Sequence, residues 1–153
     1  MYVVLNFSED NQFLELRVKN IKGKPYIFDA CRMKWVAATP EEKVRQGFCA
    51  YLIDSLNYPA VCINNECIVE INGLKQRCDT LVYKQMTPIM LVEYKAPSVI
   101  IDKSVFEQVM RYNSQFHVPY IVVTNQSQTY CCKMDYDNMS YDFIKEIPMW
   151  SDL

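Results

Sequence analysis

The chain has 153 residues, half of them hydrophobic, and only three glycines. This size and composition allow one domain with a substantial core and leave no room for a second large domain such as a motor. The formal net charge of −2 excludes a global basic field, so any nucleic-acid site must be local. Isolated glycines at positions 23, 47 and 73 also exclude a glycine-rich phosphate loop and a dinucleotide-binding fingerprint.

Seven cysteines occur without a CxxC pair and beside a single histidine, His117. This set argues against a zinc site, which needs four closely spaced ligands, and against catalysis by a Ser-His-Asp or Cys-His arrangement. The first residues lack the pattern of a signal peptide, and no run of about 18 apolar residues occurs. The sequence therefore predicts a cytoplasmic protein with reduced thiols and no membrane span.

Residues 1–36 are predicted to form a small N-terminal β-hairpin extension. Apolar residues alternate or cluster in "MYVVLNF" and "FLELRVK", as they do in strands, and "NIKGK" is a turn signal. Residues 37–153 are predicted to form a single compact domain. Basic residues cluster in the extension at Arg17, Lys19, Lys22 and Lys24. The plain interpretation of such a cluster is a solvated surface.

The first helix of the domain is predicted from the run "TPEEKVRQGFCAYLIDSLNYP". Thr39 can cap it, Pro40 suits the first helical position, and Glu42 completes a capping box. An apolar stripe at helical spacing consists of Val44, Phe48, Tyr51 and Leu52. This stripe predicts the face of the helix that packs on the core.

Strand-like runs follow at about residues 60–71, 77–83 and 88–94. A second helix is predicted over about 104–116, with Ser104 and Glu107 as its capping box. Two further strands are predicted in "PYIVVT" and "QTYCCKMD". The order of helix, three strands, helix and two strands implies an α/β fold, in which helices flank a mixed sheet on both faces.

The run "RCDTLVYKQMTPIMLVEYK" contains a pair of carboxylates. If it forms a hairpin centred near Met86, Asp79 and Glu93 lie opposite each other, about 5 Å apart at Cβ. Their face of the hairpin also carries the apolar residues Leu81, Ile89 and Leu91. Two unpaired carboxylates in such surroundings would cost several kcal/mol, and a cation between them would remove that cost.

Oxygen ligands without sulfur or imidazole suit Mg²⁺ or Mn²⁺ rather than zinc. Lys95 lies two residues beyond Glu93, so strand periodicity places its ammonium group on the same face. There it can orient or help to deprotonate a water molecule, or neutralise charge that develops on a phosphate. The alternative is that Glu93 and Lys95 form a solvated strand end and that Asp79 is a turn residue.

These motifs resemble the PD-(D/E)XK nuclease superfamily, and in particular the N-terminal nuclease domain of type I restriction enzyme R subunits, in a short stand-alone form. The resemblance covers about residues 25–147 and rests on "KWVAATPEEKVRQGF", "INGLKQRCDTLVY", "MLVEYKAP", "FEQVMRYN" and "VPYIVVTN", in this order. It implies a restriction-endonuclease-like fold and Mg²⁺-dependent hydrolysis of phosphodiester bonds. Cys78 stands where the superfamily name has proline.

The resemblance also implies roles for individual residues. Asp79 and Glu93 would be metal ligands, the Tyr94 carbonyl would add a third oxygen, and Lys95 would be the catalytic lysine. Gln108 and Tyr112, at i and i+4 on one helix face, match the Q-x-x-x-Y motif that contacts nucleic acid. The alternative for this last pair is an ordinary surface glutamine with a half-buried tyrosine.

The first helix in such folds often offers a glutamate to the metal. Glu41 shares a face with Val44 and Phe48 and is the preferred candidate, although Glu42 stays open. Glu66 matches an acidic position of this branch without a defined role. Arg45 and Arg77 are candidate phosphate contacts, with a surface or salt-bridge role as the equal alternative.

The leading hypothesis is a Mg²⁺- or Mn²⁺-dependent endonuclease that acts on DNA in restriction, defence or repair. Its partners would be DNA and other restriction-system subunits or a second copy of itself, without a membrane. The alternative is a catalytically silent, nuclease-like module that binds DNA or protein within a larger complex. An RNA or nucleotide substrate is a third hypothesis.

Overall fold

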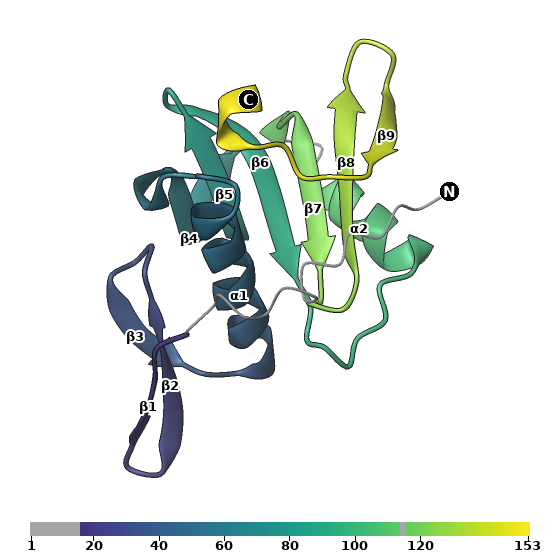
Figure 1. Cartoon of the computed structure of the whole chain (residues 1–153). Coiled ribbons are helices and arrows are strands. Elements are labelled where there is room, and N and C mark those ends of the chain that lie inside the picture. Colours follow the sequence, from purple (N-terminus) through teal and green to yellow (C-terminus); the bar gives the residue numbers. More distant parts are fainter. Residues whose placement is uncertain (1–15, 114–115) are drawn as a thin grey trace.

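The computed structural model describes residues 16–113 and 116–153, which form a three-stranded sheet, a six-stranded sheet and two α-helices (Figure 1). In chain order the elements are β1 (Val18–Ile21), β2 (Lys24–Asp29), β3 (Lys34–Ala37), α1 (Pro40–Asp54), the 3₁₀ helix η1 (Ala60–Cys62), β4 (Ile63–Ile71), β5 (Leu74–Lys84), β6 (Thr87–Tyr94), α2 (Lys103–Asn113), β7 (Tyr120–Thr124), β8 (Thr129–Asp135), β9 (Ser140–Ile144) and the 3₁₀ helix η3 (Trp150–Asp152). The predicted α/β class with a mixed sheet is confirmed.

The main sheet has the strand order β4-β5-β6-β7-β8-β9. Strands β6 and β7 run parallel, and every other neighbouring pair runs antiparallel. Helix α2 lies in the connection between the two parallel strands, as a parallel crossover requires. The sequence prediction missed β9, because most of its side chains are exposed at the sheet edge and leave no alternating apolar pattern.

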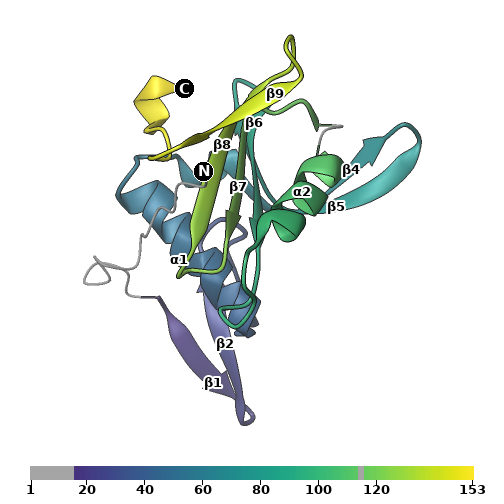
Figure 2. The ribbon, with the colours of Figure 1, turned by 90° about the vertical axis from the view of Figure 1, so that its right-hand side faces the viewer.

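The two helices cover opposite faces of the main sheet (Figures 1 and 2). On one face, Phe48 of α1 belongs to the same apolar cluster as Val82 and Val92. On the other face, Phe106 of α2 belongs to the cluster that contains Leu91. Neighbouring residues of β6 therefore enter different cores, which is the period-2 alternation of a strand covered on both sides.

The predicted caps are partly right. Thr39 caps α1, since its Oγ1 accepts a hydrogen bond from the Glu42 backbone N–H at 3.1 Å, and Pro40 is the first helical residue. The predicted cap of α2 at Ser104 is wrong, because Asp102 Oδ1 accepts from the Val105 N–H at 3.0 Å instead. An aspartate at a helix start caps as well as a serine, so both residues satisfied the same sequence rule.

The N-terminal extension is a three-stranded antiparallel sheet rather than a simple hairpin, because β3 adds to β1 and β2. Its inner face carries Ile27 and Asp29, both fully buried, and β2 contacts α1. The part of the predicted extension in residues 1–15 lies outside the described residues. Within the described chain, no helix has the length and apolar character needed to cross a membrane.

Candidate active site

The β5–β6 hairpin has the register that the sequence predicted. Thr80 pairs with Val92, and the pairs Leu81–Leu91 and Val82–Met90 continue it toward the turn. One further step in the other direction brings Asp79 opposite Glu93. A register shift next to the turn, between Val82 and Tyr83, leaves this end of the hairpin unchanged.

An open cavity of about 280 Å³ lies at this end of the hairpin, where α2 faces the sheet. It is lined by Arg77, Asp79, Glu93, Lys95, Gln108, Val109 and Asn113. Five of these residues are candidates from the sequence, and they come from β5, β6, the segment that follows β6, and α2. The fold therefore brings together residues up to about thirty positions apart around one space.

Asp79 and Lys95 are each held by a neighbour at the end of β6. The Tyr94 backbone N–H donates to Asp79 Oδ2 at 2.9 Å, and Lys95 Nζ lies 3.1 Å from Glu93 Oε1. The Tyr94 side chain points away from the cavity and is 1% exposed, with its hydroxyl donating to Thr80 Oγ1 at 3.0 Å. Tyr94 can therefore contribute to the cavity only through its main chain, as the resemblance implies.

The electrostatics of Glu93 reflect its crowded position. Burial raises its pKa, the negative charge of Asp79 raises it further, and Lys95 acts in the opposite direction. The net shift is upward, so a single ammonium group does not compensate for burial beside a second carboxylate. A carboxylate in this state gains from any additional cation that enters the cavity.

Glu41 and Glu42, at the start of α1, face different surroundings. Partial burial and the negative charge of Asp79 raise the pKa of Glu41, while Arg45 and Lys95 lower it. Glu41 is thus within electrostatic range of the cavity, although its side chain is largely exposed. Glu42 instead accepts from Arg32 at 2.9 Å and from Arg45 at 3.1 Å, on the other side of the helix.

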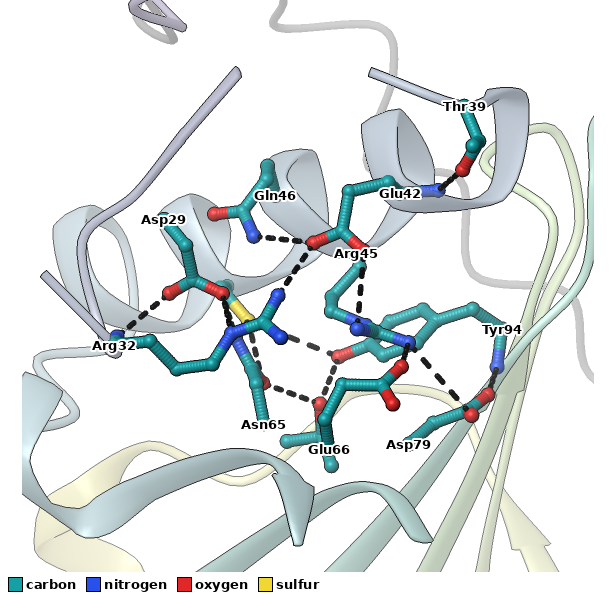
Figure 3. A network of polar contacts seen from close by, with 12 residues as sticks. Asp29, Arg32, Thr39, Glu42, Arg45, Gln46, Asn65, Glu66, Asp79 and Tyr94 are labelled. Carbon is teal, nitrogen blue, oxygen red and sulfur yellow. Dashed lines mark hydrogen bonds and ion pairs between the residues drawn. The ribbon is translucent and has the colours of Figure 1, made fainter. Parts of the chain in front are cut away.

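Arg45 is a buried hub between α1 and the sheet (Figure 3). Its side chain is only 2% exposed and forms ion pairs with Glu42 and with Glu66, the latter at 2.5 Å. Its NH2 also lies 3.7 Å from Asp79 Oδ1, and its guanidinium lies over the Tyr94 ring. Of the two alternatives from the sequence, Arg45 therefore takes the salt-bridge role and is not positioned for direct contact with a phosphate.

Glu66 occupies a bulge-like point of β4. It falls between the pairs Asn65–Thr80 and Cys67–Cys78, in the register position of Asp79, and its φ of 56° is in the left-handed region. Its carboxylate forms ion pairs with Arg45 and with Arg77, whose own side chain is 70% exposed. This acidic position therefore anchors two arginines next to Asp79 and does not line the cavity itself.

A chain of buried polar side chains connects the N-terminal sheet to the hairpin (Figure 3). Asp29 accepts from Asn65 Nδ2 at 3.0 Å, Thr80 donates to Asn65 Oδ1 at 2.6 Å, and Tyr94 donates to Thr80. Arg32 also donates a hydrogen bond to the Asp29 carboxylate, from its Nε at 2.5 Å. No local sequence pattern indicates this network, because its members are isolated polar residues in segments that meet only in the folded chain.

Asn113 is a further cavity residue that the sequence did not single out. It is 1% exposed, and neither polar atom of its side-chain amide has a hydrogen-bond partner among the residues that the structure describes. Such unpaired buried amides are uncommon and point to a missing partner. Gln108, five residues earlier in α2, also lines the cavity, whereas the side chain of Tyr112 lies outside the described part of the structure.

The donor atoms at the cavity are carboxylate and carbonyl oxygens. Within residues 16–113 and 116–153, no group of three or more histidine, cysteine or acidic side chains lies close enough together to hold a metal ion on its own. Mg²⁺ does not require such a cage, since it is typically held by one or two carboxylates together with water and substrate phosphates. Asp79 and Glu93 provide that number of carboxylates.

The fold and cavity define an α/β domain with an acidic site at the end of a central strand. Residues 40–148 match the family described as Type I restriction enzyme R protein N terminus (HSDR_N). The match covers more than half of the chain, and the chain belongs to this family.

A solved structure shows the same fold. It is a fragment assigned as an HsdR subunit of a type I restriction enzyme from Vibrio vulnificus YJ016, with a TM-score of 0.51 and 15% sequence identity. The similarity covers 76% of the present chain, which spans only 24% of that chain. No curated protein matches the sequence.

Proposed function

We propose that this chain is a metal-dependent deoxyribonuclease of the PD-(D/E)XK type, with its active site in the cavity at the end of β5 and β6. The observation that carries the proposal is the hairpin register, which brings Asp79 and Glu93 to one cavity together with Lys95. Membership in the R protein N-terminal family supports DNA as the substrate and restriction, defence or repair as the setting.

Mg²⁺ or Mn²⁺ fits the donor set of this cavity. Asp79, Glu93 and the Tyr94 carbonyl would bind the ion, and Glu41 would reach it from α1 directly or through water. The raised pKa of Glu93 favours this assignment, because a cation would offset both causes of the shift, burial first and the negative charge of Asp79 second. When bound, the ion would neutralise charge on the scissile phosphate and lower the pKa of a bound water.

The residues of the chain would position the reacting groups. The Tyr94 N–H fixes Asp79 Oδ2, and Oδ1, which lies 3.7 Å from the Arg45 NH2, would be the oxygen that turns toward a ligand. Lys95 Nζ, already held 3.1 Å from Glu93, would donate a hydrogen bond to the attacking water or to a non-bridging phosphate oxygen. Arg77 and Gln108 would contact phosphates on either side of the scissile bond.

The direct test is cleavage of supercoiled and single-stranded DNA with Mg²⁺ or Mn²⁺. The native chain should cut, and both Lys95→Ala and Asp79→Ala should abolish cutting. Lys145→Ala is the matched control, because it removes an exposed lysine outside the cavity and should cut like the native chain. Cutting that persists in the two cavity variants, or in EDTA, would contradict the proposal.

The second candidate is a silent module that binds DNA or a partner protein. Lys95 already neutralises part of the charge on Glu93, and the described residues hold no ready-made three-ligand metal site, so the cavity can exist without an ion. Measurement of Mn²⁺ binding by calorimetry separates the two functions. Binding that disappears in Asp79→Ala supports the nuclease, whereas no binding and no cutting support the module. Cutting of RNA instead of DNA would assign RNA as the substrate and leave the assignment of the active site unchanged.

A further inference from the structure

Positive charge is concentrated in the small N-terminal sheet. Residues 16–37 contain six lysines and arginines and one aspartate, a formal net charge of +5, whereas the rest of the chain carries −7. The single acid, Asp29, is fully buried and paired with Arg32, so it does not reduce the field outside the sheet. The segment lies before residue 40, where the match to the family begins.

Five of the six cations are exposed and form no ion pair with any residue that the structure describes. They are Arg17, Lys19, Lys22, Lys24 and Lys34, and none of them has an acidic partner in the described part of the chain. Surface lysines normally lie among acidic side chains of the opposite sign, with which they offset each other's field. A sheet that exposes cations alone is suited to a polyanion.

The cations and aromatic residues share one face of this sheet. The pairing of β1, β2 and β3 places Arg17, Lys19 and Lys24 on the same face as Tyr26, Phe28 and Trp35. The opposite face carries the buried Ile27 and Asp29 and packs toward α1. The face with the basic residues also borders α1, because Arg17 and Phe28 line a pocket together with Gln46, Ala50 and Asp54. Lys19 and Lys24 are exposed on this face, and Lys34 is exposed on the opposite one.

Cation–π contacts orient two of these side chains. The Arg17 guanidinium lies 4.4 Å from the centre of the Phe28 ring, and Lys19 Nζ lies 3.9 Å from that of Trp35. Each contact covers one face of the Phe28 or Trp35 ring, so that face is not available to stack on an unpaired base. They hold the cations in place instead, which suits contact with phosphates and carries no sequence preference.

The sheet projects beyond the end of the main sheet at which the β6 arrow ends (Figures 1 and 2). Its tip is the tight turn at Lys22 and Gly23, whose φ values of 49° and 80° suit a two-residue hairpin turn. The Gly23 N–H donates to Asn20 Oδ1 at 2.8 Å and closes this turn. A short, closed turn makes the projection a defined arm with charges at its tip.

We propose that residues 16–37 form an arm that binds the phosphate backbone of duplex DNA, independent of base sequence, on the α1 side of the main sheet. The arm deepens the proposed function and rests on it for the choice of DNA over other polyanions. Arg17 and Lys19 contact phosphates from the face of the arm, and Lys22 and Lys24 do so from its tip. The arm adds affinity and orientation without taking part in the chemistry.

The test is the binding of a labelled duplex of random sequence, measured by fluorescence anisotropy in EDTA at several salt concentrations. The variants are Arg17→Gln with Lys19→Gln, and Lys22→Asn with Lys24→Gln. The second pair preserves the turn, because asparagine accepts a positive φ. Each pair should weaken binding about tenfold and reduce the salt slope of log K by about 0.9 for each phosphate that the arm no longer neutralises.

The matched control is Lys133→Gln with Lys145→Gln, which removes the same charge from exposed positions far along the sequence. It should bind DNA with nearly native affinity and slope. The proposal would be overturned if both double variants of the arm bound DNA with native affinity and native salt dependence. It would also be overturned if the control variant lost as much affinity as the arm variants. Binding to phosphatidylserine vesicles that depends on the arm, with unchanged DNA binding, would reassign the arm to membranes.

Cleavage measured with Mg²⁺ in parallel separates this proposal from the proposed function. Metal-dependent cutting that requires Lys95, together with arm variants that bind normally, would refute the arm alone. Arm-dependent binding of the native chain without cutting would refute the nuclease alone. Thermal unfolding of each variant shows that a loss of affinity does not come from unfolding of the sheet.

Discussion

Two groups of charged side chains lie close together in this chain and are treated differently by the fold. Beneath α1, the buried network of Asp29, Glu42 and Glu66 meets Arg32 and Arg45, so that each carboxylate has a cation within 3.1 Å. In the cavity at the end of β5 and β6, Asp79 and Glu93 face each other, with Lys95 3.1 Å from Glu93 and Arg45 at a longer 3.7 Å from Asp79. The comparison separates charge used for structure from charge kept available for a ligand.

The pKa directions express the same difference. Burial raises the pKa of Asp29, but hydrogen bonds from the Arg32 backbone and from the Asn65 and Arg32 side chains bring it below its usual value. The pKa of Glu93 is also raised by burial, and there the neighbouring Asp79 adds to the shift. Carboxylates whose pKa stays raised beside an open cavity are candidates for functional sites.

The largest effect is expected from the cavity. Lys95→Ala should reduce DNA cleavage by about 10²–10⁴-fold, the usual contribution of a group that transfers or stabilises charge in the transition state. Its free energy of unfolding should change little, because both side chains of its one ion pair keep about a quarter to a third of their surface exposed. Single-turnover cleavage and urea unfolding measure the two quantities. A large loss of stability in Lys95→Ala would show that the cavity charges, like those of the buried network, stabilise the fold.

The buried network should respond in the opposite way. Arg45→Met should lower the free energy of unfolding by about 3–5 kcal/mol, since it leaves Glu42 and Glu66 without their buried cation. Arg77→Met is the control for stability, because its side chain is 70% exposed and surface ion pairs contribute about 0–1 kcal/mol. Equal losses for the two variants in urea unfolding would show that Arg45 is not a structural hub.

Asp29 should make stability depend on pH at the acidic end. Because its folded pKa lies below the ordinary 3.8, the ionised group stabilises the fold above pH 3.8, and this contribution is lost as the pH falls through the folded value. Asp29→Asn should therefore cost about 1–3 kcal/mol at pH 7 and progressively less below pH 3.8. Thermal or urea unfolding at several pH values gives the comparison. A cost that does not depend on pH would contradict the role of the carboxylate charge.

The neighbouring glutamates of α1 offer a matched pair. Glu41→Gln should reduce metal-dependent cleavage about tenfold, the size of effect seen when a group near a metal is removed, and should change stability by less than about 0.5 kcal/mol. Glu42→Gln should do the reverse, because Glu42 bonds to Arg32 and Arg45 in the buried network. A loss of cleavage in Glu42→Gln with normal stability would exchange the two assignments.

The smallest effect concerns Glu93 and stability. Its folded pKa is raised, so its contribution to stability is fully present below pH 4.5 and is lost as the pH rises through the folded value. Glu93→Gln should therefore be more stable than the native chain at pH 7, by roughly 0.2–1 kcal/mol for a like-charged cross-strand pair. Urea unfolding without divalent metal measures the difference. A less stable variant would mean that Lys95 already compensates fully for the buried charge.

The sequence predicted the parts of the site that depend on local structure. The Asp79–Glu93 juxtaposition follows from a single hairpin, whose register is set by a short turn and by the alternation of apolar residues. The cap at Thr39 and the helix from Pro40 follow from equally local signals. The cap of α2 was misplaced because two suitable residues, Asp102 and Ser104, stand next to its start.

The hairpin register and the carboxylate pair with its lysine could be predicted before the fold was known, because they arise from residues within about fifteen positions of one another. The packing of separate elements was needed to show that Arg45 is buried between three carboxylates, that Asp29 meets Asn65 across 36 positions, and that Asn113 lines the cavity. The same polar residues could equally have been solvated in another arrangement of the elements. Burial, which gives a charge its role, belongs to the folded chain and not to any segment of it.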